Sequence, residues 1–337
     1  MIEQLAVVIL AAHLLAVNVA SAAPLVCGWL DWREGRGDVV AGLVGRRLLW
    51  WAIAALVLGT VAGALLGWAL WDDGYRLALH RLRSKIYYGL AELAFSLTLM
   101  LLHAWCWKRG WGDGRRGRLG RGGLALLASS NLLYHFPLLL VVFARIVSGL
   151  DLGDDVLTAA DFRERIADPV VLARSLHFWL ASLAVAGAAM MVVADRERES
   201  QANSPHDGQL DGRHLVVWGA RLALVPSLLQ VLSGGWLLVE LEPLVQQRLL
   251  GGSAVASFTL AAGVAAALWL MHRLASIAMG STSRGAVRAT VAALALVVLL
   301  MSSTLRHIER PHRPARPPAE SSRTEPGVAR VHDYPAL

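Results

Sequence analysis

The sequence predicts an all-α, polytopic membrane protein whose eight transmembrane helices form two four-helix bundles. Hydrophobic residues make up 56% of its 337 residues, charged residues only 17%, and the mean hydropathy is +0.50. A soluble globular domain carries about 25% charged residues. The composition therefore excludes an ordinary soluble domain, and the distribution of apolar residues along the chain predicts the helices.

A spanning helix needs about 20 mostly apolar residues. Charged or glycine-rich linkers, such as 108–123 and 195–213, separate the apolar stretches. We expect residues 1–308 to form the membrane domain and residues 309–337, rich in proline and arginine, to form a disordered tail. The eight apolar stretches lie at about 5–28, 48–71, 86–107, 123–146, 170–194, 214–240, 254–279 and 286–305.

The basic residues predict the orientation. With the adjoining helix ends, the loops after spans 1, 3, 5 and 7 hold 17 Lys and Arg, the other loops hold 9, and the C-terminal end holds 6. Basic loops favour the cytoplasm, which places both termini outside. The net charge of +7 is therefore attributed to topology rather than to nucleic-acid binding. The two cysteines, Cys27 and Cys106, exclude a disulfide framework and a cysteine-based zinc site.

Five histidines lie inside apolar segments, where polar groups are costly and mark candidate functional sites. Imidazole is a good iron ligand, and helical bundles hold haem through histidines on facing helices. The five are candidate haem ligands, in the order of preference His13 and His177, then His135, then His103 and His272.

His13 and His177 each lie about eight residues into an outside-to-inside span, so they share a depth in the outer half of the bilayer. The sequences after them are similar, HLLAVNVASAA and HFWLASLAVAG, which predicts an internal repeat. The alternative for each histidine is a hydrogen bond between helices, which we also expect of Asn18, Asn131 and Gln230.

Arg174 and Arg306 fall near the outer ends of their spans. Arginine often pairs with carboxylates, so these residues could clamp the propionates of a haem. The alternative is that each extends its guanidinium to the membrane surface.

Helix 5 resembles a known family. Asp168-Pro169, followed by Arg174 and His177, is similar to the fifth helix of subunit I of the cytochrome bd quinol oxidases, where the histidine binds low-spin haem b. His13 falls where that family has its high-spin haem histidine. The other similar segments, in the family's order, are Gly59-Thr-Val-Ala-Gly63 with Gly67 and Trp71, Gly89-Leu90, and Ser130-Asn131-Leu132.

The sequence also departs from the family. Residues 241–253 replace its long quinol-binding loop, and Ala261 or a neighbour replaces the methionine of the low-spin haem site. Ser303 stands in place of a haem-liganding glutamate. Tyr88 and Ser96 stand in place of two glutamates of the proton route.

The resemblance implies a shortened cytochrome bd-like subunit in a bacterial inner membrane. It would bind haem b, or a modified haem such as haem d, and would carry electrons between haems, with oxygen as one acceptor. The implied partners are a homologous second membrane subunit and a c-type cytochrome that donates electrons in place of quinol. The alternative is a haem-free membrane scaffold or transport subunit with the same fold.

Overall fold

The computed structural model describes residues 2–111, 114–149, 155–202 and 211–308. The regular secondary structure of these residues is entirely helical: it includes eleven α-helices, and eight of them are long and apolar enough to cross a membrane. The predicted all-α fold with eight spans is confirmed. The eight are α1 (Ile2–Glu34), α2 (Val39–Ala69), α4 (Arg83–Lys108), α5 (Arg115–Val147), α7 (Pro169–Ala202), α8 (Arg213–Glu240), α10 (Ala254–Ala278) and α11 (Arg284–Ile308).

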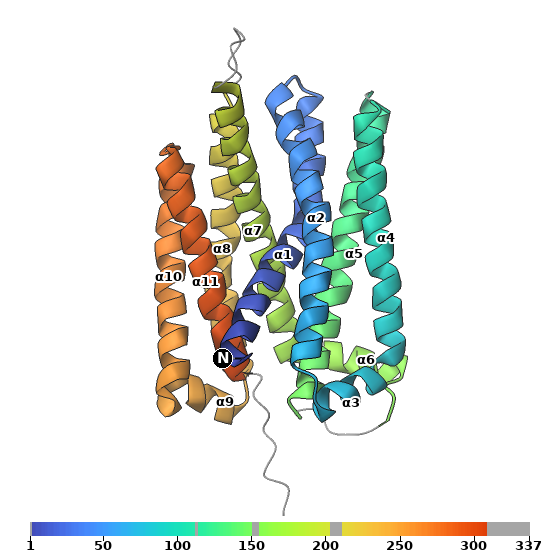
Figure 1. The fold of residues 1–337 in the computed structure, drawn as a ribbon, viewed down its shortest axis with the longest axis vertical. Coiled ribbons are helices and arrows are strands. Elements are labelled where there is room, and N and C mark those ends of the chain that lie inside the picture. Colours follow the sequence, from blue (N-terminus) through green and yellow to red (C-terminus); the bar gives the residue numbers. More distant parts are fainter. Residues whose placement is uncertain (1, 112–113, 150–154, 203–210, 309–337) are drawn as a thin grey trace, which may run out of the picture.

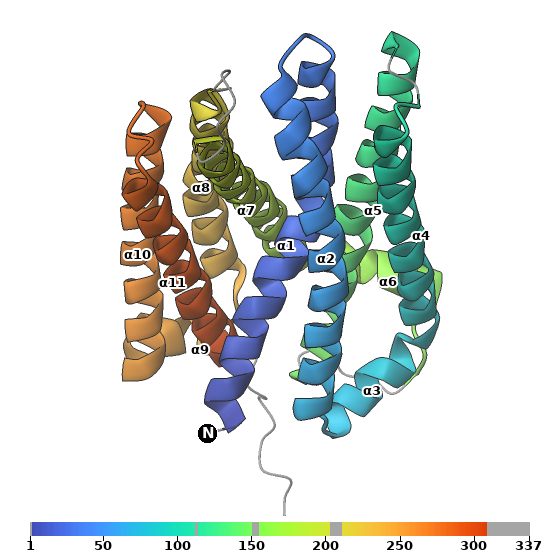
Figure 2. The ribbon, with the colours of Figure 1, turned by 45° about the horizontal axis from the view of Figure 1, so that its top comes forward.

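The long helices pack as two groups of four that follow the chain. Helices α1, α2, α4 and α5 contact one another, and so do α7, α8, α10 and α11. In Figures 1 and 2, α4 and α5 lie on one side and α10 and α11 on the other, with α1 and α7 between them. Helix α1 packs against α7, so the first helix of each bundle joins the two halves.

One apolar core runs through both bundles. It includes Leu30, Leu48, Met100, Met190 and Leu215, which are almost completely buried. Many large apolar side chains elsewhere are exposed, including Leu58, Leu232 and Phe258. Such exposure is expected where lipid replaces water as the solvent.

Short helices fill the connections at the end of the molecule that carries the N-terminus: α3 (Asp73–Arg81), α6 (Ala159–Ile166) and α9 (Pro243–Gln247) (Figure 1). Asp72 caps α3 by accepting from the Tyr75 amide at 2.8 Å, and Thr158 and Asp161 cap α6 reciprocally. A second apolar cluster that includes Leu82, Ile146 and Leu157 packs against α3 and α6, and a third that includes Val245 and Leu249 contains α9.

The long helices extend beyond the apolar stretches into the two linkers named from the sequence. Helix α5 begins at Arg115 and α7 continues to Ala202, so much of 108–123 and part of 195–213 is helical. Arginine and glutamate are good helix formers but are not apolar. Hydropathy therefore marks the part of a helix within the bilayer, while the helix itself is longer. Residues 309–337, predicted to be a disordered tail, lie outside the described residues.

Candidate functional site

His13 in α1 contacts α2. Its Nδ1 lies 2.8 Å from the carbonyl oxygen of Gly59, and a Cβ at Gly63 would lie 2.9 Å from its Cε1. Gly63 therefore leaves the space that the imidazole ring fills, and Gly59 supplies the carbonyl that its Nδ1 contacts. Because a carbonyl only accepts, Nδ1 carries the proton and Nε2 keeps its lone pair.

His177 in α7 contacts α8 in the same manner. Its Nδ1 lies 3.1 Å from the hydroxyl oxygen of Ser233, and that hydroxyl donates to the carbonyl of Gln230 at 3.3 Å. When the hydroxyl donates to this carbonyl it accepts from Nδ1, and in that arrangement Nε2 again keeps its lone pair. The side-chain amide nitrogen of Gln230 lies 3.4 Å from Nε2. The interhelical hydrogen bond expected of Gln230 is therefore present, with a donor–acceptor distance near the upper limit for such a bond.

A second pair of contacts repeats between the bundles. Fourteen residues after each histidine, Cys27 in α1 lies 3.4 Å from the carbonyl oxygen of Gly45, and Met191 in α7 lies against Gly219. Gly45 precedes Gly59 by fourteen residues, and Gly219 precedes Ser233 by the same number. The two helical hairpins therefore pack with corresponding antiparallel registers, and the internal repeat stays a prediction.

His135 lies in α5 among aromatic side chains. Its ring is half-buried and meets Tyr88 of α4 and Tyr134 edge to face, with ring centres 5.4 and 5.0 Å away. His272 is exposed on α10. These two candidates occupy helices other than those of His13 and His177, and their surroundings resemble neither of those sites.

His103 in α4 is buried more deeply than its place near the inner end of a span suggests. It is 1% exposed and stacks on Trp107, with the rings nearly parallel and 5.2 Å apart. Within the described part of the chain, neither ring nitrogen has a hydrogen-bond partner. An unpartnered polar group in the interior is costly, so His103 is the histidine whose environment is least satisfied by the protein itself.

Arg174 lies at the end of the molecule that holds the N-terminus. It lines a small cavity of about 20 Å³ with Arg145, Glu242 and Ile308, while Arg145 pairs with Asp168 at 3.3 Å. Ile308 ends α11 two residues after Arg306, so the ends of α7 and α11 that carry the two predicted arginines lie together. A cavity of this size holds a water molecule rather than a haem.

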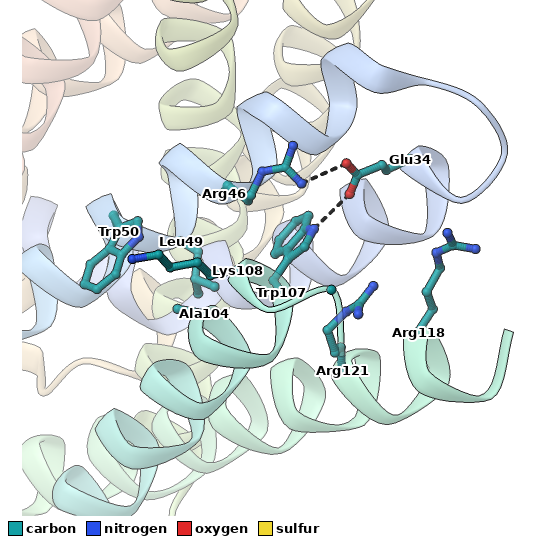
Figure 3. A pocket seen from close by; sticks show the side chains of 10 residues that line it. Glu34, Arg46, Leu49, Trp50, Ala104, Trp107, Lys108, Arg118 and Arg121 are labelled. Carbon is teal, nitrogen blue, oxygen red and sulfur yellow. Dashed lines mark hydrogen bonds and ion pairs between the residues drawn. The ribbon is translucent and has the colours of Figure 1, made fainter. Parts of the chain in front are cut away.

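A charged cluster at the opposite end is not among the predicted sites. Asp31 of α1 accepts two hydrogen bonds of 2.8 Å from Arg121 of α5, and the two side chains are 1% and 3% exposed. The nearby Glu34 accepts from Arg46 and from the indole nitrogen of Trp107, each at 2.8 Å (Figure 3). An acid within the last turn of an apolar helix is the sequence signal that could have revealed this cluster.

The described residues contain no group of three or more His, Cys, Asp and Glu side chains that could hold a metal ion. This finding concerns multidentate sites. A haem iron takes four ligands from its porphyrin and needs only one or two from the protein, so single histidines are sufficient.

No protein-family model matches this chain, and no curated protein matches it. The functional argument consequently depends on the arrangement of its own side chains and on the sequence features described above.

Proposed function

We propose that the chain is a haem-b-binding membrane subunit of a cytochrome bd-like oxidoreductase complex and carries electrons between haems in the outer half of the bilayer. One observation supports this most: His13 and His177 occupy corresponding positions in the two bundles, and at each an oxygen that can accept a hydrogen bond lies beside Nδ1, which leaves the Nε2 lone pair for a ligand. That tautomer is the one an axial haem ligand requires when it binds through Nε2.

The donor set fits a haem. A ring N–H fixed by an oxygen acceptor orients a ligating imidazole and raises its basicity, and the carbonyl of Gly59 and the hydroxyl of Ser233 provide these acceptors. At His177 the Gln230 amide would have to turn aside, which costs little because its 3.4 Å contact is long. The bound haem would supply reversible one-electron transfer, and its potential would depend on ligation and burial.

The predicted orientation places His13 and His177 near one another in depth, on the side of the outer termini. Arg174, beside the end of α11 that carries Arg306, would pair with haem propionates there only if the groups around its small cavity moved apart to admit them. The second membrane subunit, the c-type cytochrome donor and oxygen as an acceptor follow from the family resemblance, as does the bacterial inner membrane.

The test is a pyridine haemochrome assay with a reduced-minus-oxidised spectrum of the purified full-length chain. We expect near-stoichiometric haem b, loss of the low-spin signal in His177→Ala, and loss of a second haem in His13→Ala. His272→Ala is the matched control, because that histidine is exposed and its removal should leave the spectrum unchanged. Absence of haem from wild-type protein expressed with sufficient haem would overturn the proposal.

A haem-free scaffold is the second candidate. It is favoured by the contacts of His177, whose two ring nitrogens both have protein neighbours without any cofactor. In this case, His177→Ala would lower stability without changing any visible spectrum, so the same variants separate the two functions.

A further inference from the structure

We infer that the cavity enclosed by the ends of α1, α2, α4 and α5 binds the phosphate group of an anionic phospholipid. The cavity has a volume of about 540 Å³, and its lining side chains are drawn in Figure 3. It lies by the turn between α1 and α2, at the end of the first bundle opposite the N-terminus (Figure 1). Its volume lies within the range of small-ligand sites. Its lining includes four basic residues, Arg46, Lys108, Arg118 and Arg121, but a single acid, Glu34.

Two of these cations are already neutralised and two are not. Arg46 pairs with Glu34, and Arg121 pairs with the buried Asp31. Lys108 and Arg118 form no hydrogen bond or ion pair through their side chains with any described residue. The cavity therefore carries an excess of positive charge that an anion would balance.

Glycines hold the lining side chains against the backbone. A Cβ at Gly35 would lie 2.6 Å from an Arg118 guanidinium nitrogen, and a Cβ at Gly45 would lie 2.5 Å from the Trp107 ring. Neither arrangement could form with a larger residue unless the side chain moved. The position of the Arg118 guanidinium therefore depends on the close approach of α5 to the α1–α2 turn, and that of the Trp107 indole on the close approach of α4 to α2.

The location favours a lipid phosphate over a soluble one. Helix α1 ends at Glu34 and α4 at Lys108, so the cavity lies where the spans leave the apolar layer and the headgroups begin. Its other wall consists of Leu49, Ala104 and the exposed Trp50, which is suited to acyl chains. Basic pockets between helix ends on the cytoplasmic side are typical sites for anionic headgroups, and the predicted orientation places this end in the cytoplasm.

The experiment measures thermal unfolding of the purified full-length protein in neutral detergent. Dioleoylphosphatidylglycerol, dioleoylphosphatidylcholine, inorganic phosphate or glycerol 3-phosphate is added in separate titrations. We expect phosphatidylglycerol to raise the melting temperature saturably and phosphatidylcholine to have no such effect. An equal rise with either soluble phosphate would overturn the assignment to a lipid, and no rise with any of the four would overturn the site.

The variant Lys108→Gln/Arg118→Gln should bind phosphatidylglycerol about thirtyfold more weakly, since each nearby cation contributes about a factor of five to six. The matched control is Arg115→Gln/Arg116→Gln, which removes the same charge from exposed positions on α5 outside the cavity. Its affinity should stay near that of the wild type. Equal weakening in the two variants would mean that overall surface charge attracts the lipid, and the cavity assignment would fail. Melting in phosphatidylcholine alone confirms that each variant folds.

Discussion

The hydroxyl of Ser182 in α7 donates a 2.7 Å hydrogen bond to Oδ1 of Asn18 in α1, and both side chains are buried. Each of these residues follows a candidate haem histidine, His177 or His13, by five positions. Equivalent residues of the two bundles therefore contact each other where the bundles meet. Such self-pairing is expected at the axis that relates two copies of a repeat.

Removing the hydrogen bond between Ser182 and Asn18 should weaken the interface between the two bundles. We expect Asn18→Ala and Ser182→Ala to be destabilising and the double variant to show a coupling energy of about 0.6 kcal/mol, as is usual for interhelical hydrogen bonds in membranes. The measurement is reversible unfolding in mixed detergent micelles. Thr98→Ala is the control, since that hydroxyl is exposed and donates only within its own helix, to Ala94. Strict additivity of the two substitutions would contradict the prediction.

The buried pair of Asp31 and Arg121 should be intolerant of losing one partner. Asp31→Asn or Arg121→Gln leaves a charge in the interior, for which the usual cost is about 3–5 kcal/mol. The combination Asp31→Leu/Arg121→Met removes both charges and should recover most of that stability. The exposed pair of Arg76 and Asp73 provides the comparison, because Arg76→Gln should change the free energy of unfolding little. Similar small effects at both pairs would contradict this expectation.

Asp38, in the turn between α1 and α2, should make stability depend on acid pH. Burial, the largest effect, raises the pKa of its carboxyl. The hydrogen bond from His214 at 2.9 Å, the Ala41 amide and the charge of Arg33 together outweigh burial, so the pKa lies below its usual value. The folded state thus releases this proton more readily than the unfolded state. The stabilising effect is fully present above about pH 4 and is lost as the pH falls through the lowered pKa.

Asp38→Asn tests this linkage, because asparagine keeps the capping of α2 but carries no charge. The melting temperature of the wild type should exceed that of the variant at pH 7, and the difference should shrink below about pH 4. Asp38→Ala removes the cap as well, so its melting temperature should be lower than that of Asp38→Asn both at pH 7 and below about pH 4. A difference between wild type and Asp38→Asn that stays constant from pH 7 to 3 would refute the linkage.

Gly187 and Gly219 lie where the backbones of α7 and α8 approach closely. A Cβ at Gly187 would lie 2.6 Å from the backbone nitrogen of Ala223 and 2.8 Å from the carbonyl oxygen of Gly219. Backbone atoms cannot move aside as a flexible side chain can. Gly187→Ala should therefore cost about 1–3 kcal/mol of unfolding free energy. At Gly235, on the same helix pair, a Cβ meets nothing within 4 Å, so Gly235→Ala should be neutral or slightly stabilising.

The eight spans and their order could be predicted from the sequence because hydropathy depends only on local composition and length. The interhelical roles of Asn18, Asn131 and Gln230 were predictable for a similar reason: an amide in an apolar span needs a partner, and Asn131 finds the Glu92 carbonyl at 2.9 Å and the Ser96 hydroxyl at 2.8 Å. The short helices α3 and α6 were not predicted, because each has few residues and lies in a polar connection where hydropathy gives no signal.

The sequence by itself determined which helices carry histidines, and it predicts a shared depth for His13 and His177. Only the tertiary structure decided that His103 is buried while His272 is exposed, and that Asp31 meets Arg121 from ninety residues away. Most of the spanning helices are apolar all round, so no stripe of hydrophobic residues tells which side faces the interior. Depth is a property of one segment, whereas the inward face and the partner across it depend on how each helix is rotated against its neighbours.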